Sequence, residues 1–188
     1  LYNFIGGRGL AAKFLFDELE AGIDPLSPKN RLLIIAGPLT GTDFPGSGRV
    51  SISSKSPLTG TIFDSSMGGT FGLHLRRAGF DGIIVEGRAE RPVYLLLNDG
   101  DIRIEEASHL WGMTTSKAEA ELKARHYGSG VAVIGPAGEN LVYIANIMSE
   151  GRTAGRGGLG AVMGSKNLKA VVAKGRKRVK IAHREAYE

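Results

Sequence analysis

Glycine is the feature that most limits how this chain can fold. It supplies 28 of the 188 residues, about twice the usual share of roughly 7%. The glycines stand between short apolar runs such as Arg31–Ala36 and Val131–Ile134, so they do not form a linker. Because glycine accepts positive φ and close backbone contacts, this spacing predicts many short elements joined by tight turns.

Apolar periodicity predicts more strands than helices. Helices are expected at Leu10–Glu20, Thr70–Ala78 and Ala118–Tyr127, the last with a capping box formed by Ser116 and Glu119. Asp99-Gly100 predicts a hairpin turn. The expected strands are Arg31–Ala36, Arg49–Ser54, Thr61–Phe63, Gly82–Glu86, Val93–Leu97, Ile102–Glu105, Val131–Ile134, Leu141–Ile147 and Ala170–Ala173. This pattern favours an α+β fold with mixed or antiparallel sheets over a regular doubly wound fold.

Two parts of the chain resemble each other. Three segments of the first half recur in the same order in the second: Arg31–Pro38 as Val131–Pro136, Gly48-Arg49 as Gly155-Arg156, and Ser54-Lys55 as Ser165-Lys166. A duplicated core would give two equivalent glycine loops facing one ligand. Chance similarity of strand–turn segments is the alternative.

Composition excludes several classes of site. The chain has no cysteine, which excludes a disulfide scaffold, a thiol nucleophile, a Cys-ligated zinc site and an iron–sulfur cluster of its own. No apolar run approaches the roughly 18 residues of a membrane span, and residues 1–10 lack the pattern of a signal peptide. We therefore expect a cytoplasmic protein with no membrane partner.

Most of the net charge of +5 lies at one end of the chain. Residues 174–188 hold six basic and two acidic residues, with Tyr187 as the only aromatic side chain among them. A basic run without interleaved aromatics is typical of a solvated linker rather than a nucleic-acid site. We expect no nucleic-acid partner.

The segment Gly151–Lys166 is the densest candidate binding motif, with six glycines and two arginines between residues 151 and 164. Converging backbone N–H groups and guanidinium forks suit a phosphate. Close helix–sheet packing is the alternative reading. The match of Gly155, Gly157 and Gly160 to a dinucleotide fingerprint is weak, because Lys180 stands where an acidic residue would contact the ribose. The chain also lacks a P-loop.

Three further glycine-containing loops suggest that the phosphate belongs to one extended, ring-bearing ligand: Gly6–Gly9, Phe44–Arg49 and Ser65–Gly72. No catalytic residue is assigned. His74, His109, His126 and His183 lack metal-ligand spacing, and there is no Gly-x-Ser-x-Gly elbow. The chain is therefore expected to be a binding scaffold whose chemistry is supplied elsewhere.

Six segments of the chain resemble a known family. The segments that carry the resemblance are Ile5–Ala11 (IGGRGLA), Asp24–Pro28 (DPLSP), Ala36–Thr42 (AGPLTGT), Lys55–Gly60 (KSPLTG), Ile134–Asn140 (IGPAGEN) and Ala154–Ala170 (AGRGGLGAVMGSKNLKA). Over nearly its whole length the chain is similar to the N-terminal domain of tungsten-containing aldehyde:ferredoxin oxidoreductases. The resemblance implies two packed mixed β-sheets of about six strands each, with flanking helices.

The resemblance also implies a set of cofactor-binding positions. They fall on Arg49, Ser66, Gly68, Arg152, Thr153, Gly155 and Arg156. These residues would hold the phosphates of a tungstopterin, a bis-molybdopterin with tungsten or molybdenum. A Mg²⁺ would be bound through the backbone carbonyls of Ser66 and Thr153. Ser66 stands where the family has Asn, and Thr153 where it has Ala. A carbonyl ligand survives such changes, whereas an Asn side-chain contact to the pterin does not.

For the larger protein, the resemblance implies oxidation of a small aldehyde to a carboxylate, with electrons passing through a [4Fe-4S] cluster to ferredoxin. The cluster ligands would lie beyond residue 188, so the chain is read as an excerpt that is inactive alone. We expect a pterin-binding domain over residues 1–174 and a basic linker over 175–188. Homo-oligomerisation stays open. The alternative function is a stand-alone module that binds a phosphate- or nucleotide-type ligand without redox chemistry.

Overall fold

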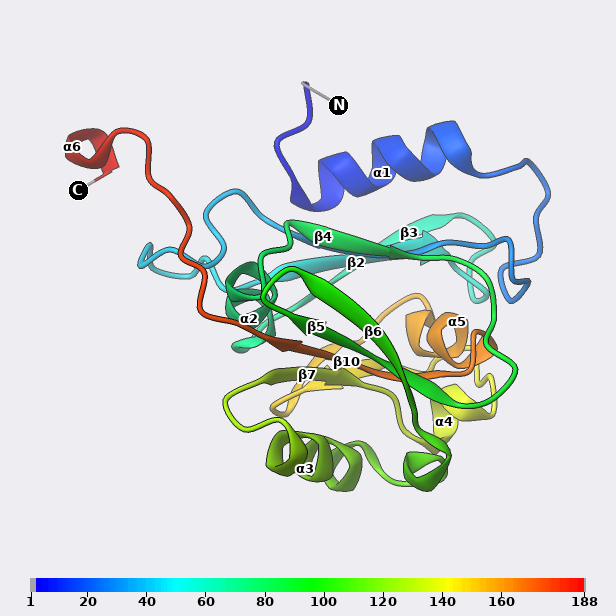
Figure 1. Ribbon diagram of the computed structural model, residues 1–188. Coiled ribbons are helices and arrows are strands. Elements are labelled where there is room, and N and C mark those ends of the chain that lie inside the picture. The colour runs from blue at the N-terminus through cyan, green and yellow to red at the C-terminus, as the bar shows by residue number, and fades with distance from the viewer. Residues whose placement is uncertain (1–2, 188) are drawn as a thin grey trace.

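The structure is a computed structural model that describes residues 3–187 (Figure 1). The helices are α1 (Gly7–Glu18), α2 (Phe71–Arg77), the 3-10 turn η1 (Ser108–Leu110), α3 (Thr115–Arg125), α4 (Pro136–Glu139), α5 (Leu159–Ser165) and α6 (Arg184–Tyr187). The strands are β1 (Leu32–Ala36), β2 (Val50–Lys55), β3 (Ile62–Met67), β4 (Gly82–Val85), β5 (Val93–Asn98), β6 (Asp101–Glu106), β7 (Gly130–Val133), β8 (Ile147–Ser149), β9 (Arg152–Ala154) and β10 (Leu168–Lys174).

The strands form two sheets. One has four strands in the order β3-β2-β1-β4, and all its pairs are antiparallel. The other has six strands in the order β6-β5-β10-β7-β8-β9, in which only β5 and β10 are parallel. The predicted α+β class is confirmed. The expectation of about six strands holds for the second sheet, whereas the first has four within residues 3–187.

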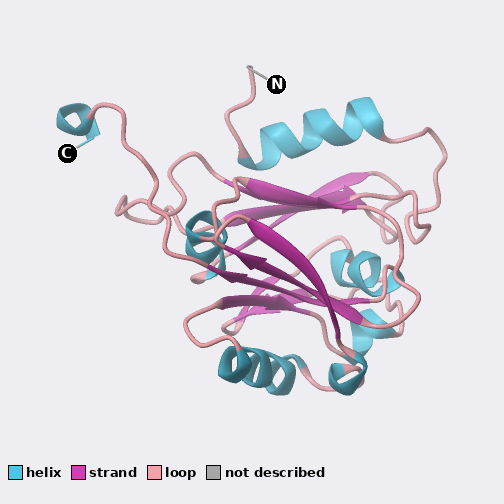
Figure 2. Ribbon diagram, in the orientation of Figure 1, coloured by secondary structure: helices cyan, strands magenta, loops and turns pink. Residues whose placement is uncertain are grey.

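The two sheets are stacked, with α1 on the outer face of the four-stranded sheet and α3 on the outer face of the six-stranded sheet (Figure 1, Figure 2). The helices α2 and α5 lie between the sheets and contribute to the core there. Alternate residues of a strand point to opposite faces, and β1 uses both. Leu32 and Ile34 join the core between the sheets, while Leu33 and Ile35 pack against α1. In β10 the residues Val171 and Ala173 face the inter-sheet core, whereas Ala170 and Val172 join the cluster that contains α3 residues. Burial on both faces explains why these strands are continuous apolar runs.

One predicted strand is wrong. Over the predicted range 141–147 the chain turns, with φ of +58° at Leu141, and only Ile147 belongs to a strand, as the first residue of β8. The short helix α4 precedes this turn, and α5 packs closely against it. A methyl group on Gly160 would lie 2.6 Å from the carbonyl oxygen of Asn146. The segment therefore provides the surface on which α5 packs, and it cannot extend as a strand.

The cap predicted for α3 is also displaced. Its N-cap is Thr114, whose hydroxyl accepts a hydrogen bond from the backbone N–H of Lys117 at 3.5 Å. Ser116 is already inside the helix. The carboxylate of Glu119 instead accepts the backbone N–H of Glu150 at 3.0 Å. A tertiary contact has therefore taken the role that local capping would have given this glutamate.

The internal repeat corresponds in structure at only one of its three points. Arg31–Pro38 contains β1 and Val131–Pro136 contains β7, and each strand lies inside its sheet and ends near a Gly-Pro. Ser54 and Lys55 end a strand, whereas Ser165 ends a helix. Gly48-Arg49 precedes β2, but Gly155-Arg156 follows β9. The structure thus supports a repeated strand–Gly-Pro unit.

The C-terminal segment leaves the second sheet after β10 and extends away from the body of the molecule (Figure 1). It contacts the body at several places: the backbone N–H of Lys177 donates to the carbonyl oxygen of Arg77 at 3.0 Å, and the ring centroids of Tyr187 and Phe44 are 6.4 Å apart. Within residues 3–187, no helix has the length and apolar character needed to cross a membrane.

Candidate functional site

Three loops surround a cavity of about 480 Å³ at one end of the stacked sheets. One loop leads into β2, the second joins β3 to α2, and the third belongs to the β8–β9 hairpin. The residues that line the cavity are Gly46, Gly48, Arg49, Ser66, Gly68, Gly69, Arg152 and Thr153. Segments more than 100 residues apart, such as those of Arg49 and Arg152, therefore meet at one place.

Strand order and glycine contacts explain why these loops meet. The strands β3 and β9 are the edge strands of the two sheets, and they contact each other. The loop before β2 leans on the loop after β3 through residues without side chains. A methyl group on Gly48 would lie 3.1 Å from the carbonyl oxygen of Gly69, and one on Gly72 would lie 2.6 Å from that of Gly48. Larger residues would push the two loops apart.

The cavity presents positive charge that the protein itself does not neutralise. Arg49 and Arg152 are exposed, and neither guanidinium forms a hydrogen bond or ion pair within residues 3–187. In the same part of the chain, the loop N–H groups of Gly46 and Gly69 have no hydrogen-bond partner. Guanidinium forks and free peptide N–H groups are the donors that bind phosphate oxygens. The residues present therefore fit a phosphate-bearing group.

Among the residues that the structure describes, no acidic side chain lines the cavity. Ser66 of β3 pairs with Ser51 of β2, and Thr153 of β9 pairs with Met148 of β8. Because β3 and β9 are sheet edges, alternate carbonyl groups lack a ladder partner. No cluster of His, Asp or Glu suited to a metal occurs within the described residues. A cation at this place would rely on backbone and ligand oxygens, which suit Mg²⁺.

Five of the seven predicted site residues line this cavity: Arg49, Ser66, Gly68, Arg152 and Thr153. Gly155 and Arg156 are exposed just beyond β9 and do not line it. Of the four loops expected to share one ligand, three are present. The fourth, Gly6–Gly9, lies at the start of α1, where Arg8 Nε contacts Asp64 Oδ1 at 2.9 Å. That loop ties α1 to β3 and is not part of the cavity.

The glycine-rich segment Gly151–Lys166 divides into two parts. Residues 151–156 are exposed except for Ala154, and they supply Arg152 and Thr153 to the cavity. Residues 157–166 are buried and contain α5. A methyl group on Gly158 would lie 3.1 Å from Cγ of Pro57, which illustrates how close this packing is. The packing interpretation therefore holds for residues 157–166, and the binding interpretation stays a prediction for residues 151–156.

Glu150 links two of these loops, and the sequence alone does not predict this role. Glu150 precedes Gly151 in the β8–β9 turn with φ of +51°, and its carboxylate accepts hydrogen bonds from Thr70. A Glu-Gly pair between short strands signals a turn, as Asp99-Gly100 does. Nothing local indicates a partner 80 residues away.

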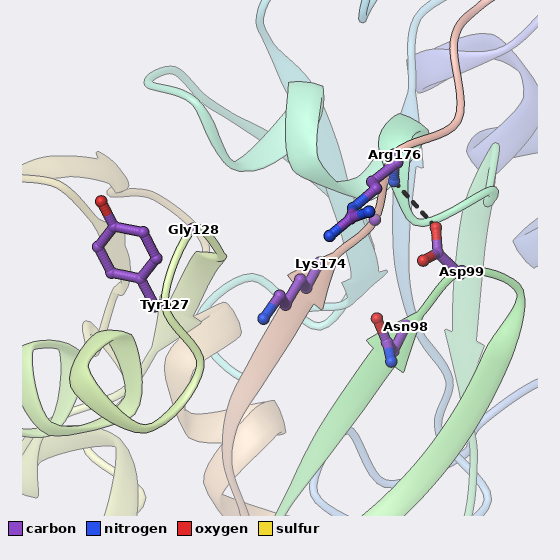
Figure 3. A pocket seen from close by; sticks show the side chains of 7 residues that line it. Asn98, Asp99, Tyr127, Gly128, Lys174 and Arg176 are labelled. Carbon is purple, nitrogen blue, oxygen red and sulfur yellow. Dashed lines mark hydrogen bonds between the residues drawn. The ribbon is translucent and has the colours of Figure 1, made fainter.

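A second and slightly larger cavity, of about 550 Å³, lies at the carboxyl ends of the parallel strands β5 and β10 (Figure 3). Lys174 and Arg176 stand on one side of it, and Tyr127 lies across the opening. Asp99 also lines this cavity and accepts the backbone N–H of Arg176 at 2.9 Å. Its walls thus mix both charges, and it contains none of the predicted site residues.

Comparisons with known proteins identify the domain. The family described as aldehyde ferredoxin oxidoreductase, N-terminal domain, matches residues 1–175. The chain is 52% identical over 98% of its length to a tungsten-containing aldehyde ferredoxin oxidoreductase of Pyrococcus furiosus, and spans 31% of that protein. It is 50% identical over 98% of its length to the protein of the same name from Thermococcus kodakarensis, again spanning 31% of the relative.

A solved structure agrees with the sequence relatives. It is described as the active site complex BamBC of benzoyl coenzyme A reductase in complex with 1,5-dienoyl-CoA. It superposes with a TM-score of 0.95 at 41% identity, over 98% of this chain and 28% of that chain. The fold, the glycine motifs and these matches agree, and the chain belongs to the family of aldehyde ferredoxin oxidoreductase N-terminal domains.

Proposed function

We propose that the cavity between β3 and β9 binds the phosphate groups of a tungsten-bearing pyranopterin, and that this chain is the cofactor-binding domain of an aldehyde-oxidising enzyme. One observation carries the proposal: Arg49 and Arg152 meet in one cavity, and neither has an acidic partner within residues 3–187. Exposed cations that the protein leaves unpaired are available to an anionic ligand. The tungsten named in the relatives supports the choice of cofactor.

Each residue of the cavity has a role in this proposal. Arg49 and Arg152 donate to phosphate oxygens through their planar forks, which bind such oxygens in pairs. Gly68 and Gly69 carry no side chain, so a phosphate can approach the peptide backbone. Gly155 and Arg156 stay in the proposed set because they directly follow β9 and are exposed. Their contribution is expected to be smaller, since they do not line the cavity.

We further propose that Mg²⁺ binds at the facing edges of the two sheets. The backbone carbonyls of Ser66 and Thr153 would be its protein ligands, and phosphate and water oxygens would complete its coordination. Support comes from the place of both residues on the edge strands that border the cavity. Carbonyl and phosphate oxygens are hard ligands suited to this ion. Ser66 stands where the family has Asn, and Thr153 where it has Ala, but a backbone carbonyl is present whichever side chain occupies the position.

When bound, the cofactor supplies two-electron redox chemistry at its metal. In the overall reaction, an aldehyde and water give a carboxylate, two electrons and three protons. In the proposed enzyme, a [4Fe-4S] cluster would carry the electrons to ferredoxin. This chain contains no cysteine, so the cluster ligands must come from outside it. The cavity lining contains neither a carboxylate nor a histidine, so proton transfer is also assigned to the rest of the enzyme. We propose that the chain alone is inactive.

Substrate choice is assigned to the parts of the enzyme outside this chain. The matched relatives are named for aldehyde oxidation, whereas the matched solved structure is named for benzoyl coenzyme A reduction. A shared cofactor-binding domain is compatible with both names. We propose a domain boundary after Lys174, where β10 ends, with residues 175–188 linking to the remainder of a cytoplasmic enzyme.

A stand-alone module that binds a phosphate-bearing ligand is the second candidate. The observation in its favour is that the lining formed by the described residues contains neither a carboxylate nor a histidine. Metal and pterin analysis of the full-length protein separates the two candidates. Tungsten or molybdenum together with pterin supports the oxidoreductase, whereas a phosphate-bearing ligand without pterin supports the module.

The proposal is tested with an Arg49→Ala/Arg152→Ala variant of the full-length protein. We expect the variant to fold as the parent does but to lose most of its tungsten and pterin, and aldehyde oxidation with ferredoxin should fall in proportion. Lys174→Ala/Arg176→Ala is the matched control, because it removes two cations from the other cavity. Full cofactor content in the Arg49/Arg152 variant would overturn the proposed site.

A further inference from the structure

Glu150 connects parts of the cavity wall that belong to different sheets. It lies in the turn between β8 and β9 of the six-stranded sheet. Its carboxylate accepts the backbone N–H of Thr70 at 3.0 Å and the Thr70 hydroxyl at 2.8 Å, and Thr70 follows β3 of the four-stranded sheet. The other carboxylate oxygen accepts Lys123 Nζ of α3 at 2.9 Å. Three separate segments therefore meet at one side chain.

The carboxylate of Glu150 fits against the β3–α2 loop because residue 69 is a glycine. Gly69 has φ of +86°, and a methyl group there would lie 3.2 Å from Glu150 Oε2. The same methyl group would lie 3.6 Å from Cγ of Arg152. The stem of Arg152 therefore runs beside the point where Glu150 meets the β3–α2 loop. The position of the Arg152 guanidinium in the cavity depends on how firmly this junction is held.

The backbone of the turn is held from a second side. The N–H of Glu150 donates to both carboxylate oxygens of Glu119, at 3.0 and 3.1 Å. Lys123 lies 3.1 Å from Glu119 and 2.9 Å from Glu150, so it bridges the two acids. Although partial burial raises the pKa of Glu150, the hydrogen bonds from Lys123 and Thr70 outweigh it and lower the pKa to about 2. Glu150 is therefore ionised throughout the physiological range.

A carboxylate beside a cavity for anions needs a reason, because its charge repels the ligand. We propose that Glu150 is a positioning residue that fastens the β8–β9 turn to the β3–α2 loop, and so holds Arg152 and Gly68-Gly69 in one arrangement for a phosphate group. The identity of the ligand rests on the proposed function, whereas the fastening itself does not. Glu150 contacts no ligand in this arrangement and acts through Arg152 and the glycine loop.

Positioning and simple electrostatics predict opposite results for Glu150→Ala. Removing a negative charge from the rim should tighten anion binding if charge alone matters. If Glu150 positions the cavity, binding should weaken despite the more favourable charge. We expect the affinity for inorganic diphosphate, measured by titration calorimetry, to fall on the order of tenfold, the size of one loosened charge-assisted hydrogen bond. Stronger or unchanged binding by Glu150→Ala would overturn the positioning role.

Two variants distinguish positioning from a general loss of stability. Glu150→Gln keeps an oxygen that can accept from Thr70, so it should recover most of the lost affinity. Glu121→Ala is the matched control, because it also removes one negative charge. Glu121 lies in α3, and its Oε1 is 3.3 Å from Nε2 of His109. This control variant should leave diphosphate affinity unchanged. Equal loss in the Ala and Gln variants, or loss in the Glu121 control, would contradict the proposal.

Amide hydrogen exchange tests the fastening without any ligand. In Glu150→Ala, the amide of Thr70, which donates to Glu150 in the parent protein, and the amides of β9 should exchange faster than in the parent, while those of β5 and β10 stay protected. This readout still applies if diphosphate does not bind to the parent protein. In that case the proposed phosphate site fails, and unchanged exchange at Thr70 and in β9 is the result that would overturn the fastening.

Discussion

The segment from Gly151 to Ala170 contains two pairs of cations whose surroundings are opposite. Arg152 and Arg156 are exposed, and their side chains make no hydrogen bond or ion pair within residues 3–187. Lys166 and Lys169 are 2% and 0% exposed, respectively, and both are hydrogen-bonded by the protein. Basic residues of one glycine-rich motif therefore differ in structural role.

The partners of the two lysines show what they hold together. Lys166 donates to the carbonyl oxygens of Asn30 at 2.5 Å, Gly87 at 3.2 Å and Pro28 at 3.3 Å. It thereby ties the end of α5 to the loops that border β1 and β4. Lys169 pairs with Glu139 of α4 and donates to the carbonyl oxygen of Met113 at 2.9 Å. These lysines join segments of the fold, whereas the arginine side chains have no protein partner within residues 3–187.

The largest effect is expected from breaking the buried pair. Lys169→Ala would leave the carboxylate of Glu139, only 4% exposed, without its cation. Removing one partner of a buried ion pair costs about 3–5 kcal/mol. Urea unfolding followed by circular dichroism should show a loss of this size. Because the double variant Lys169→Met/Glu139→Leu leaves no buried charge, it should recover most of it. A loss below about 1 kcal/mol in Lys169→Ala would remove the distinction from the exposed arginines.

The next effect concerns ligand binding with no change in folding. Arg152→Ala should alter the free energy of unfolding by less than about 0.5 kcal/mol, because no protein partner is lost. In the full-length protein it should lower cofactor content, as each charge-assisted contact contributes about 1.5–3 kcal/mol. Arg156→Ala should have a smaller effect, since Arg156 does not line the cavity. Metal and pterin analysis of both variants measures this order. A larger loss in Arg156→Ala would reverse the assignment.

The smallest effect is a pH dependence that separates Lys166 from the exposed cations. Burial lowers the pKa of Lys166 from 10.5 to about 8. Between these values the unfolded chain binds more protons than the folded one, so the free energy of unfolding rises with pH. The rise from about pH 8 to pH 10 should be on the order of 1 kcal/mol larger in the parent protein than in Lys166→Met. Parallel pH profiles of the two proteins would show that Lys166 titrates normally.

The sequence predicted the elements that depend on local chemistry. The Asp99-Gly100 turn correctly indicated the β5–β6 hairpin, and the apolar run at 31–36 correctly indicated β1. Glycine and arginine types pointed to the loops of the cavity. The individual site residues came from the family resemblance, and their roles stay predictions.

What the sequence could not indicate depends on contacts between distant segments. The turn at 141–147 is shaped by the close approach of Gly160, and no residue within that turn signals it. The bond between Thr70 and Glu150 joins positions 80 residues apart. Lys169 looks as basic as Arg152 in the sequence, and what distinguishes them is the tertiary contact of Lys169 with Glu139 of α4. Local patterns thus predict where turns occur, while tertiary packing decides which polar groups remain free.

The most direct test of the account is a titration of inorganic diphosphate against three proteins: the parent, Arg152→Ala and Lys174→Ala. The two variants each remove one exposed cation, but from different cavities. We expect Arg152→Ala to bind diphosphate at least tenfold more weakly than the parent, because it loses one charge-assisted hydrogen bond of about 1.5–3 kcal/mol. Lys174→Ala should bind as the parent does. Equal weakening in both variants, or weakening in Lys174→Ala alone, would contradict the claim that the cavity between β3 and β9 is the phosphate site.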